Sequence, residues 1–287
     1  MRGVMLRTAG NYASFHLRLQ SALGSLTSWL LAPLYFLFIK FRGYRIRDLD
    51  KIRRQWAGLL ESHKGPWLIC GNHLTLIDSV IMIYALMSLG RHVTEYSRLP
   101  WNLPERANFQ RNVFLTVLCY LAKCIPVSRG GDREEMQATL AKCNYLLGRQ
   151  QILMVFPEGR RSRSGRVDTE NFSYGVGRFL QDHPDCRVLC VYLRGDAQAL
   201  YGDMPGRGET FTITMDAFLP RMPDRQGLRA QRDLAGQIVH RLAQMEEEYF
   251  DQHRQRYCRF DQSGQHREKP GPALHCPRLH SGRTGTD

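Results

Sequence analysis

This chain of 287 residues lacks paired cysteine motifs and has few acidic residues. Its eight cysteines include no C-x-x-C pair, so neither a zinc site nor a disulfide framework is expected, and reduced, mostly buried thiols favour a reducing compartment. Acidic residues are few, because 27 Asp and Glu stand against 40 Lys and Arg and leave a net charge of +13. That excess favours an anionic partner, namely nucleic acid, anionic lipid or a phosphorylated substrate, without choosing among them.

Long apolar runs are also few, and the one that stands out is short for a membrane span. Residues 23–39 are 17 uncharged residues with Pro33 near the middle, whereas a spanning helix needs about 20. No A-x-A-like cleavage site follows, which counts against a signal peptide. A buried core helix is a further alternative. Trp29, Tyr35 and the flanking cations favour a membrane-inserted or interfacial helix pair, kinked near Pro33.

Short apolar segments alternate with longer helical ones from residue 66 onward. Strands are predicted over residues 67–70, 92–97, 124–128, 152–157, 187–193 and 210–218, and helices over 76–89, 105–122, 132–148 and 228–250. This alternation predicts an α/β fold with a central, mostly parallel sheet flanked by helices. We divide the chain into an N-terminal membrane-associated helical segment (1–50), an α/β domain (51–250) and a basic, disordered tail (251–287).

A histidine and an aspartate follow the first predicted strand, in the stretch GNHLTLIDSV (71–80). On one regular helix, His73 and Asp78 would point about 140° apart and would not meet. They meet if His73 lies in the loop and Asp78 in the first turn of the helix. The carboxylate then holds one ring nitrogen as N–H and leaves the other as a base. A helix-capping histidine beside a solvated aspartate is the alternative, which this spacing alone does not exclude.

Two more polar clusters follow predicted strands, where α/β sheets bind ligands. Residues 128–131 read SRGG, and residues 158–163 read EGRRSR. Arginine forks suit phosphate groups, and the glycines let backbone N–H groups approach an anion. A solvated basic loop is the alternative for either cluster alone, but Glu158 directly after a buried strand is harder to explain in that way.

Together these residues resemble a known family. NHLTLID (72–78) is similar to the N-H-x4-D motif of the glycerolipid and lysophospholipid acyltransferases, the 1-acyl-sn-glycerol-3-phosphate acyltransferase-like proteins. FPEGRRS (156–162) is similar to their F-P-E-G-T-R-S motif, and CIPVSR (124–129) resembles the block between the two. The order and separations agree, and the resemblance covers roughly residues 25–220.

The resemblance implies an enzyme that moves a fatty acyl group from acyl-CoA or acyl carrier protein to the hydroxyl of a lysolipid, in phospholipid biosynthesis. His73 would be the general base, and Asp78 would orient its ring. The acceptor pocket would comprise Arg129, Glu158, Gly159, Arg160, Arg161 and Ser162. No metal, cofactor or nucleic acid is implied. The N-terminal segment would hold the domain at the membrane surface, on the cytoplasmic face of the inner membrane.

The sequence departs from the family pattern in ways that leave the acceptor open. Arg160 stands where the family has threonine, and the block LCVYLRG (189–195) lacks the usual proline. An aminolipid or a specialised product is therefore an alternative acceptor. A basic, non-catalytic membrane-binding protein is an alternative from another class, but it leaves His73, Asp78 and Glu158 unexplained. A hydrolase that uses water is disfavoured, because no G-x-S-x-G elbow is present and the arginines would have no purpose.

Overall fold

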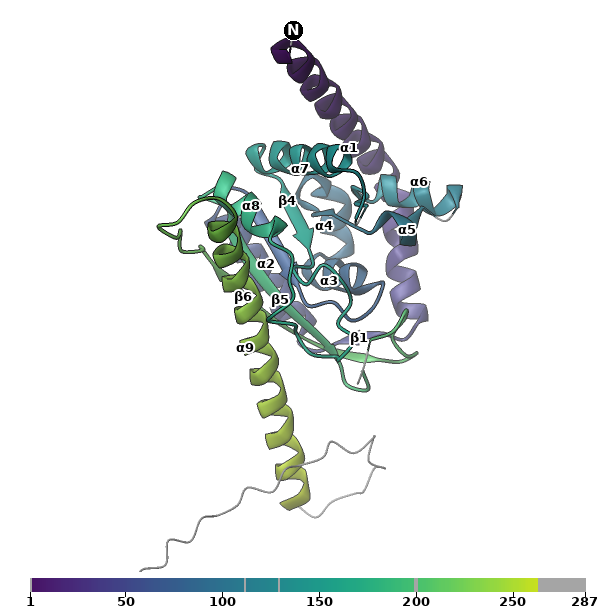
Figure 1. Cartoon of the computed structure of the whole chain (residues 1–287). Coiled ribbons are helices and arrows are strands. Elements are labelled where there is room, and N and C mark those ends of the chain that lie inside the picture. The colour runs from purple at the N-terminus through teal and green to yellow at the C-terminus, as the bar shows by residue number, and fades with distance from the viewer. Residues whose placement is uncertain (1, 111, 129, 199–200, 263–287) are drawn as a thin grey trace, which may run out of the picture. The chain divides into compact units, whose positions relative to one another are not determined.

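The computed structural model describes residues 2–110, 112–128, 130–198 and 201–262. The chain divides into two compact units, residues 1–248 and 249–287, and the first contains a six-stranded sheet (Figure 1). The strands are β1 (Arg45–Ile46), β2 (Trp67–Gly71), β3 (Trp101–Asn102), β4 (Ile152–Val155), β5 (Arg187–Gly195) and β6 (Thr210–Phe218). Their order is β1-β6-β5-β2-β4-β3, and every pair is parallel except β5–β6. The predicted mixed α/β fold with a mostly parallel sheet is confirmed.

Helices precede, connect and follow these strands. They are α1 (Arg2–Phe41), α2 (Leu49–Ser62), α3 (Asp78–Leu86), α4 (Leu89–Thr94), the 3-10 turn η1 (Tyr96–Arg98), α5 (Arg106–Phe109), α6 (Val113–Leu121), α7 (Arg133–Gly148), α8 (Gly175–Asp182) and α9 (Gly227–Gln262). Helix α9 does not end near residue 250 as expected, but continues to Gln262, into the predicted tail. Residues 263–287 lie outside the described residues, so the limits of the tail stay a prediction.

The central strands β2 and β5 are covered on both faces of the sheet. On one face, alternate side chains of β5 join the main apolar core with residues of α1, α2 and α3: Leu189, Val191 and Leu193. On the other face, Cys190 Sγ donates to the Ile238 carbonyl of α9 at 3.8 Å, and the Tyr192 hydroxyl donates to Glu246 of α9 at 3.2 Å. Because helices cover both faces of the sheet, the polar loops gather at the carboxyl ends of the strands.

Two strand predictions are wrong. Residues 92–97 lie in α4 and η1, because Ser88 caps α4 at the backbone N–H of Arg91 and the Arg91 side chain pairs with Glu95 one turn later, at 2.8 Å. Residues 124–128 form only isolated bridges, at Cys124 and Val127. Pro126 has no N–H to donate to a ladder, which accounts for the interrupted pairing.

The N-terminal apolar segment forms one helix rather than the expected pair. Helix α1 continues through Pro33, which is exposed. Residues Ser14–Phe41 are long and apolar enough to cross a membrane by length and composition. One face of this stretch is packed on the rest of the unit, through Leu17, Gln20, Ser28, Ala32, Phe36 and Ile39. Membrane association is therefore suggested by one helix, of which one side is already covered by protein.

Candidate active site

The loop after β2 is fixed by Gly71 and Asn72. A Cβ on Gly71 would come within 2.5 Å of Met82 Cε, at the end of a flexible side chain, so β2 packs closely against α3 at this position. Asn72 is buried, donates from Nδ2 to the Leu193 carbonyl at 3.0 Å and accepts from the Leu193 N–H at 2.8 Å. The amide therefore extends the pairing of β2 with β5 by one residue and fixes the position from which the next residue, His73, projects.

His73 and Asp78 lie in contact, His73 in the loop and Asp78 at the first residue of α3. The distance from His73 Nδ1 to Asp78 Oδ2 is 3.0 Å. Asp78 is 2% exposed and also accepts from Leu74 N at 2.6 Å, Thr75 N at 2.7 Å and Thr75 Oγ1 at 2.5 Å. With so many donors around it, the carboxylate is held as an acceptor, so Nδ1 carries the proton and Nε2 is left as a lone-pair nitrogen.

The imidazole of His73 is held flat against a neighbouring ring. Its centroid lies 4.1 Å from that of Phe156, with 16° between the planes. Phe156 follows β4, which pairs in parallel with β2, so both rings leave the sheet at the same edge. The His73 side chain is 14% exposed and lines a cavity. The ring is thus fixed in orientation and still accessible from one side.

Glu158 joins the loops that follow β2 and β4. Its Oε1 accepts from the His73 N–H at 3.2 Å, and its Oε2 accepts from the Asp168 N–H at 3.3 Å. The side chain is 4% exposed, and this burial raises the pKa of the carboxyl to about 7. The next residue, Gly159, has φ +68°, a conformation that favours glycine. Glu158 thus braces the backbone of His73 and also lines the cavity.

The two arginines after Gly159 point to different places. Arg160 is largely exposed, lines the cavity beside His73 and pairs with Asp168 at 3.0 Å. Arg161 donates from Nη1 to the Gly202 carbonyl and to Asp203 Oδ1, both at 2.7 Å. It is not among the residues that line the cavity. Both guanidinium groups therefore already have a carboxylate partner.

Ser162 and Arg129 complete the predicted set. The Ser162 N–H donates to the His73 carbonyl at 2.8 Å, and its buried hydroxyl donates to the Arg166 carbonyl. Ser162 therefore ties the two loops together, and its hydroxyl is directed at backbone. Arg129 lies outside the described residues.

The cavity beside His73 has a volume of about 770 Å³, within the range of about 300–1,000 Å³ for small-molecule sites. His73, Glu158 and Arg160 lie at its polar part. Its apolar lining comes from α7, α8, the end of β4 and neighbouring loops: Leu103, Val127, Met136, Leu140, Val155, Val176 and Phe179. A molecule with a polar group beside His73 and an apolar chain matches this lining.

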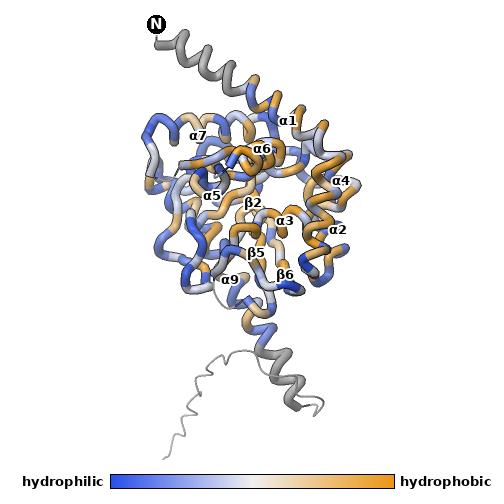
Figure 2. Tube along the Cα trace, turned by 90° about the vertical axis from the view of Figure 1, so that its right-hand side faces the viewer, coloured by the Kyte–Doolittle hydropathy of each residue, from blue (hydrophilic) through white to orange (hydrophobic). Residues whose placement is uncertain are grey.

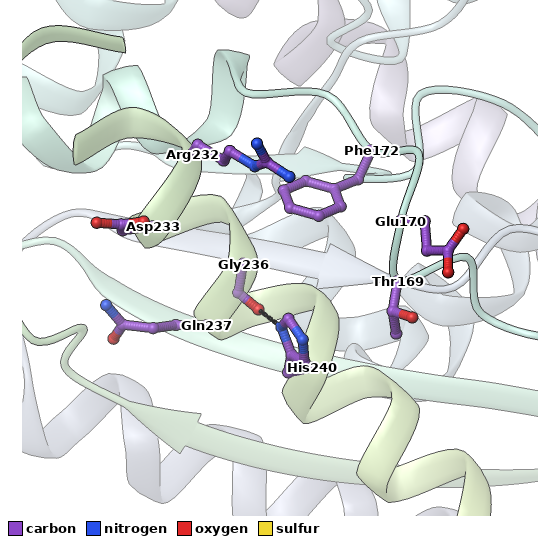
Figure 3. A pocket seen from close by; sticks show the side chains of 8 residues that line it. All are labelled: Thr169, Glu170, Phe172, Arg232, Asp233, Gly236, Gln237 and His240. Atoms are coloured by element: carbon purple, nitrogen blue, oxygen red, sulfur yellow. Dashed lines mark hydrogen bonds between the residues drawn. The ribbon is translucent and has the colours of Figure 1, made fainter. Parts of the chain in front are cut away.

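A second cavity of about 850 Å³ lies between α9 and the loop 169–172 (Figure 3). Arg232 extends from α9 toward Phe172, and the His240 ring is bonded through Nδ1 to the Gly236 carbonyl at 2.7 Å. Asp233 and Glu170 also line it, so its carboxylates offset the charge of Arg232. None of the described residues predicted for the site lines it, and we place no chemistry there.

Sequence reasoning missed several residues that shape the site. Asn72 lies in the motif NHLTLID and Phe156 in the motif FPEGRRS, so these motifs could have pointed to both residues. Thr75 lies between His73 and Asp78 and carries no pattern of its own. Asp168 and Asp203, the partners of the two arginines, follow no motif and gave no signal.

The geometry shows an α/β domain with a partly accessible histidine paired to a buried carboxylate, beside a partly apolar cavity. A family model described as Acyltransferase matches residues 44–194, and the chain belongs to this family, whose domain is of the 1-acyl-sn-glycerol-3-phosphate acyltransferase type. The matched range contains every residue predicted for the site. The chain is accordingly an acyltransferase that uses an acyl donor and a lipid acceptor. Comparison with curated proteins finds none that matches.

Proposed function

We propose that this acyltransferase moves a fatty acyl group from acyl-CoA or acyl carrier protein to the hydroxyl of a lysolipid such as lysophosphatidic acid. The observation that carries the proposal is the 3.0 Å contact between His73 Nδ1 and Asp78. It leaves Nε2 as the base, on a ring that lines the cavity. A hydroxyl is a poor nucleophile until its proton is removed, and this arrangement supplies that base.

In the reaction, His73 Nε2 takes the proton from the acceptor hydroxyl while the oxygen attacks the thioester carbonyl carbon. A carbon–oxygen bond forms, the carbon–sulfur bond breaks, and the proton passes from the imidazolium to the departing thiolate. Asp78 stabilises the imidazolium between these steps, and its other hydrogen bonds keep it in place. The apolar part of the cavity is suited to an acyl chain.

The remaining residues of the site hold the acceptor and the loops. Arg160 faces the cavity and takes the anionic head group, with Arg161 and Arg129 as further cations for it. Glu158, Gly159 and Ser162 fix the loop on which the arginines stand. The apolar helix α1 holds the enzyme on the membrane, at the cytoplasmic face of the inner membrane, where a role in phospholipid biosynthesis would place it.

The test is to incubate the enzyme with acyl-CoA or acyl carrier protein thioester and a panel of lysolipids, and to identify products by mass spectrometry. The proposal expects thiol release that depends on lysolipid, with the acyl group recovered as an ester of the acceptor. Release at the same rate without lysolipid would indicate a hydrolase, and no release with any acceptor would favour the non-catalytic alternative.

An acceptor with an amino group is a second candidate, because both site arginines are paired with carboxylates. Asp203, which contacts Arg161, is 77% exposed and is available to an ammonium group. Asp203→Asn separates the candidates. With a purely anionic acceptor, freeing Arg161 should lower the KM for lysophosphatidic acid about two- to fivefold, the range for an exposed ion pair. With an amine-bearing acceptor, the variant should lose use of that acceptor instead.

A further inference from the structure

Helix α6 is an apolar helix whose side chains are all left at least partly accessible. Its sequence, VFLTVLCYL, contains no charged residue, and none of its residues is buried. Val113 is 80% exposed and Phe114 is 78% exposed. A helix of a soluble domain normally turns its apolar stripe to the core and polar side chains to water. This helix therefore lacks the partner that its composition requires.

Helix α1, which lies beside α6, also leaves large apolar side chains exposed. Helix α1 contacts α6, and in Figure 2 α6 is mostly hydrophobic whereas α1 mixes hydrophobic and hydrophilic residues along its length. Opposite its packed face, α1 exposes ten large apolar side chains: Phe15, Leu19, Leu23, Leu26, Trp29, Leu30, Leu34, Leu37, Phe38 and Phe41. With Val113, Phe114 and Val117 of α6, they form what we call the apolar platform. Exposed apolar surface of this extent marks a binding surface.

The charges at the ends of the platform indicate which partner covers it. Lys40 and Arg45 follow one end of the apolar stretch of α1, and both are exposed. Arg18, near the other end, is also exposed and donates to the Tyr145 hydroxyl of α7 at 3.2 Å. Arg207 lies over the ring of Phe41, 5.3 Å from its centroid. Apolar side chains bordered by cations match an anionic lipid bilayer, in which the chains enter the acyl region and the cations meet the head groups.

From these observations we infer that α6 is a second membrane-binding element, inserted into the same leaflet surface as α1. The packed face of α1 runs from Leu17 to Ile39, so the apolar stretch lies along the protein and in the plane of the interface. The segment before α6 lines the active-site cavity through Leu103 and Glu105, which precede α5, and through Asn108 of α5. Insertion of α6 therefore brings the entrance of the cavity to the bilayer surface, where a lysolipid resides. This consequence rests on the proposed function, acyl transfer to a lysolipid.

The direct test is photochemical crosslinking from single positions of the full-length protein. A benzophenone side chain would replace Phe114, and two equally exposed residues would serve as references: Leu26 on α1 and Leu228 at the start of α9, which are 75% and 72% exposed. The protein would be bound to vesicles of phosphatidylcholine and phosphatidylglycerol, irradiated and analysed by mass spectrometry. We expect lipid adducts at positions 114 and 26 and none at position 228.

Three results would overturn the inference. Adducts at position 114 to a second copy of the chain would make the platform a protein interface. An absence of lipid adducts at position 114, with lipid adducts at position 26, would leave α1 alone at the membrane. If lipid adducts were as frequent at position 228 as at position 114, the crosslinking would reflect only random collisions between the protein and the vesicles. None of these readouts depends on turnover, so they are separate from a failure of the proposed acyl transfer.

A functional variant adds a second test. Val113→Ser combined with Phe114→Ser removes most of the α6 part of the platform, and Leu228→Ser is the matched control. Because burial of one phenylalanine changes partitioning by about tenfold or more, the double variant should lose about tenfold in activity on lysolipid in vesicles. It should keep its activity on lysolipid in detergent micelles, and the control should keep both. An equal loss in the two assays would mean that α6 is needed for folding instead.

Discussion

Replacing Glu158 by glutamine tests how the buried carboxyl of the site affects the stability of the fold. In the native protein its pKa is raised from the ordinary 4.5 to about 7 because the side chain is buried. The unfolded chain releases this proton near pH 4.5, whereas the folded protein retains it up to about pH 7. The unfolded state therefore binds fewer protons between these values, and stability falls as the pH rises through them.

The size of this effect follows from the difference between the two pKa values. At about 1.4 kcal/mol per pKa unit, a rise from 4.5 to about 7 corresponds to about 3 kcal/mol. The wild-type protein should lose roughly that much stability between pH 4.5 and 7 through Glu158 and nothing further above pH 7. Glutamine does not titrate. One of the two carboxylate oxygens is replaced by an NH2 group, which faces the backbone N–H of His73 or of Asp168 and cannot accept from it. This lowers the free energy of unfolding by about 1–3 kcal/mol, by the same amount at every pH.

The measurement is the free energy of unfolding of both full-length proteins in detergent, from denaturant titrations between pH 4.5 and 8. The difference between wild type and Glu158→Gln should shift in favour of the variant by about 3 kcal/mol as the pH rises to 7, and should then stay constant. Parallel profiles for the two proteins would refute the reasoning, because they would mean that Glu158 has the same pKa in the folded and unfolded states.

Two further substitutions probe the loops of the site. Arg160→Ala should raise the KM for an anionic acceptor by about ten- to a hundredfold and leave the KM for the donor thioester unchanged, because Arg160 lines the cavity. Lysine should rescue it only in part, since it lacks the planar fork. Steady-state kinetics in both substrates checks this, and a selective loss of donor binding would reverse the assignment. Asn72→Ala should lower the free energy of unfolding by about 1–3 kcal/mol, because loss of the two side-chain bonds to Leu193 leaves its buried backbone N–H and carbonyl groups unpaired. An unchanged denaturation midpoint would contradict this.

The core of the fold could be predicted because it rests on short, continuous apolar runs. The segments that became β2, β4, β5 and β6 stand out as apolar or alternating runs, and the parallel pairing of β2 with β4 and β5 follows from the helices between these strands. The segment 92–97 failed because its aromatic and β-branched residues favour a strand locally, whereas the Ser88 cap and the Arg91–Glu95 pair stabilise a helix. Local composition was outweighed by contacts one helical turn apart.

The candidate site was predictable where the backbone alone brings residues together. His73 and Asp78 are five positions apart, so a loop followed by a helix start sufficed to predict their contact. The directions of Arg160 and Arg161 were not predictable, because adjacent loop residues give no sign of which side chain faces the cavity. The contact of Arg161 with Asp203 joins positions 42 residues apart in sequence and depends on how the loop between β5 and β6 folds back.

The most direct test of the central claim is the turnover of His73→Ala, measured as transfer of the acyl group from thioester to lysolipid. If His73 removes the proton from the acceptor hydroxyl, its loss should lower kcat by about 10²–10⁴-fold or more. Circular dichroism and the unfolding midpoint should confirm that the variant is folded, since the ring is partly exposed and alanine leaves its backbone bonds to Glu158 and Ser162 intact. Near-normal turnover by the folded variant would contradict the account.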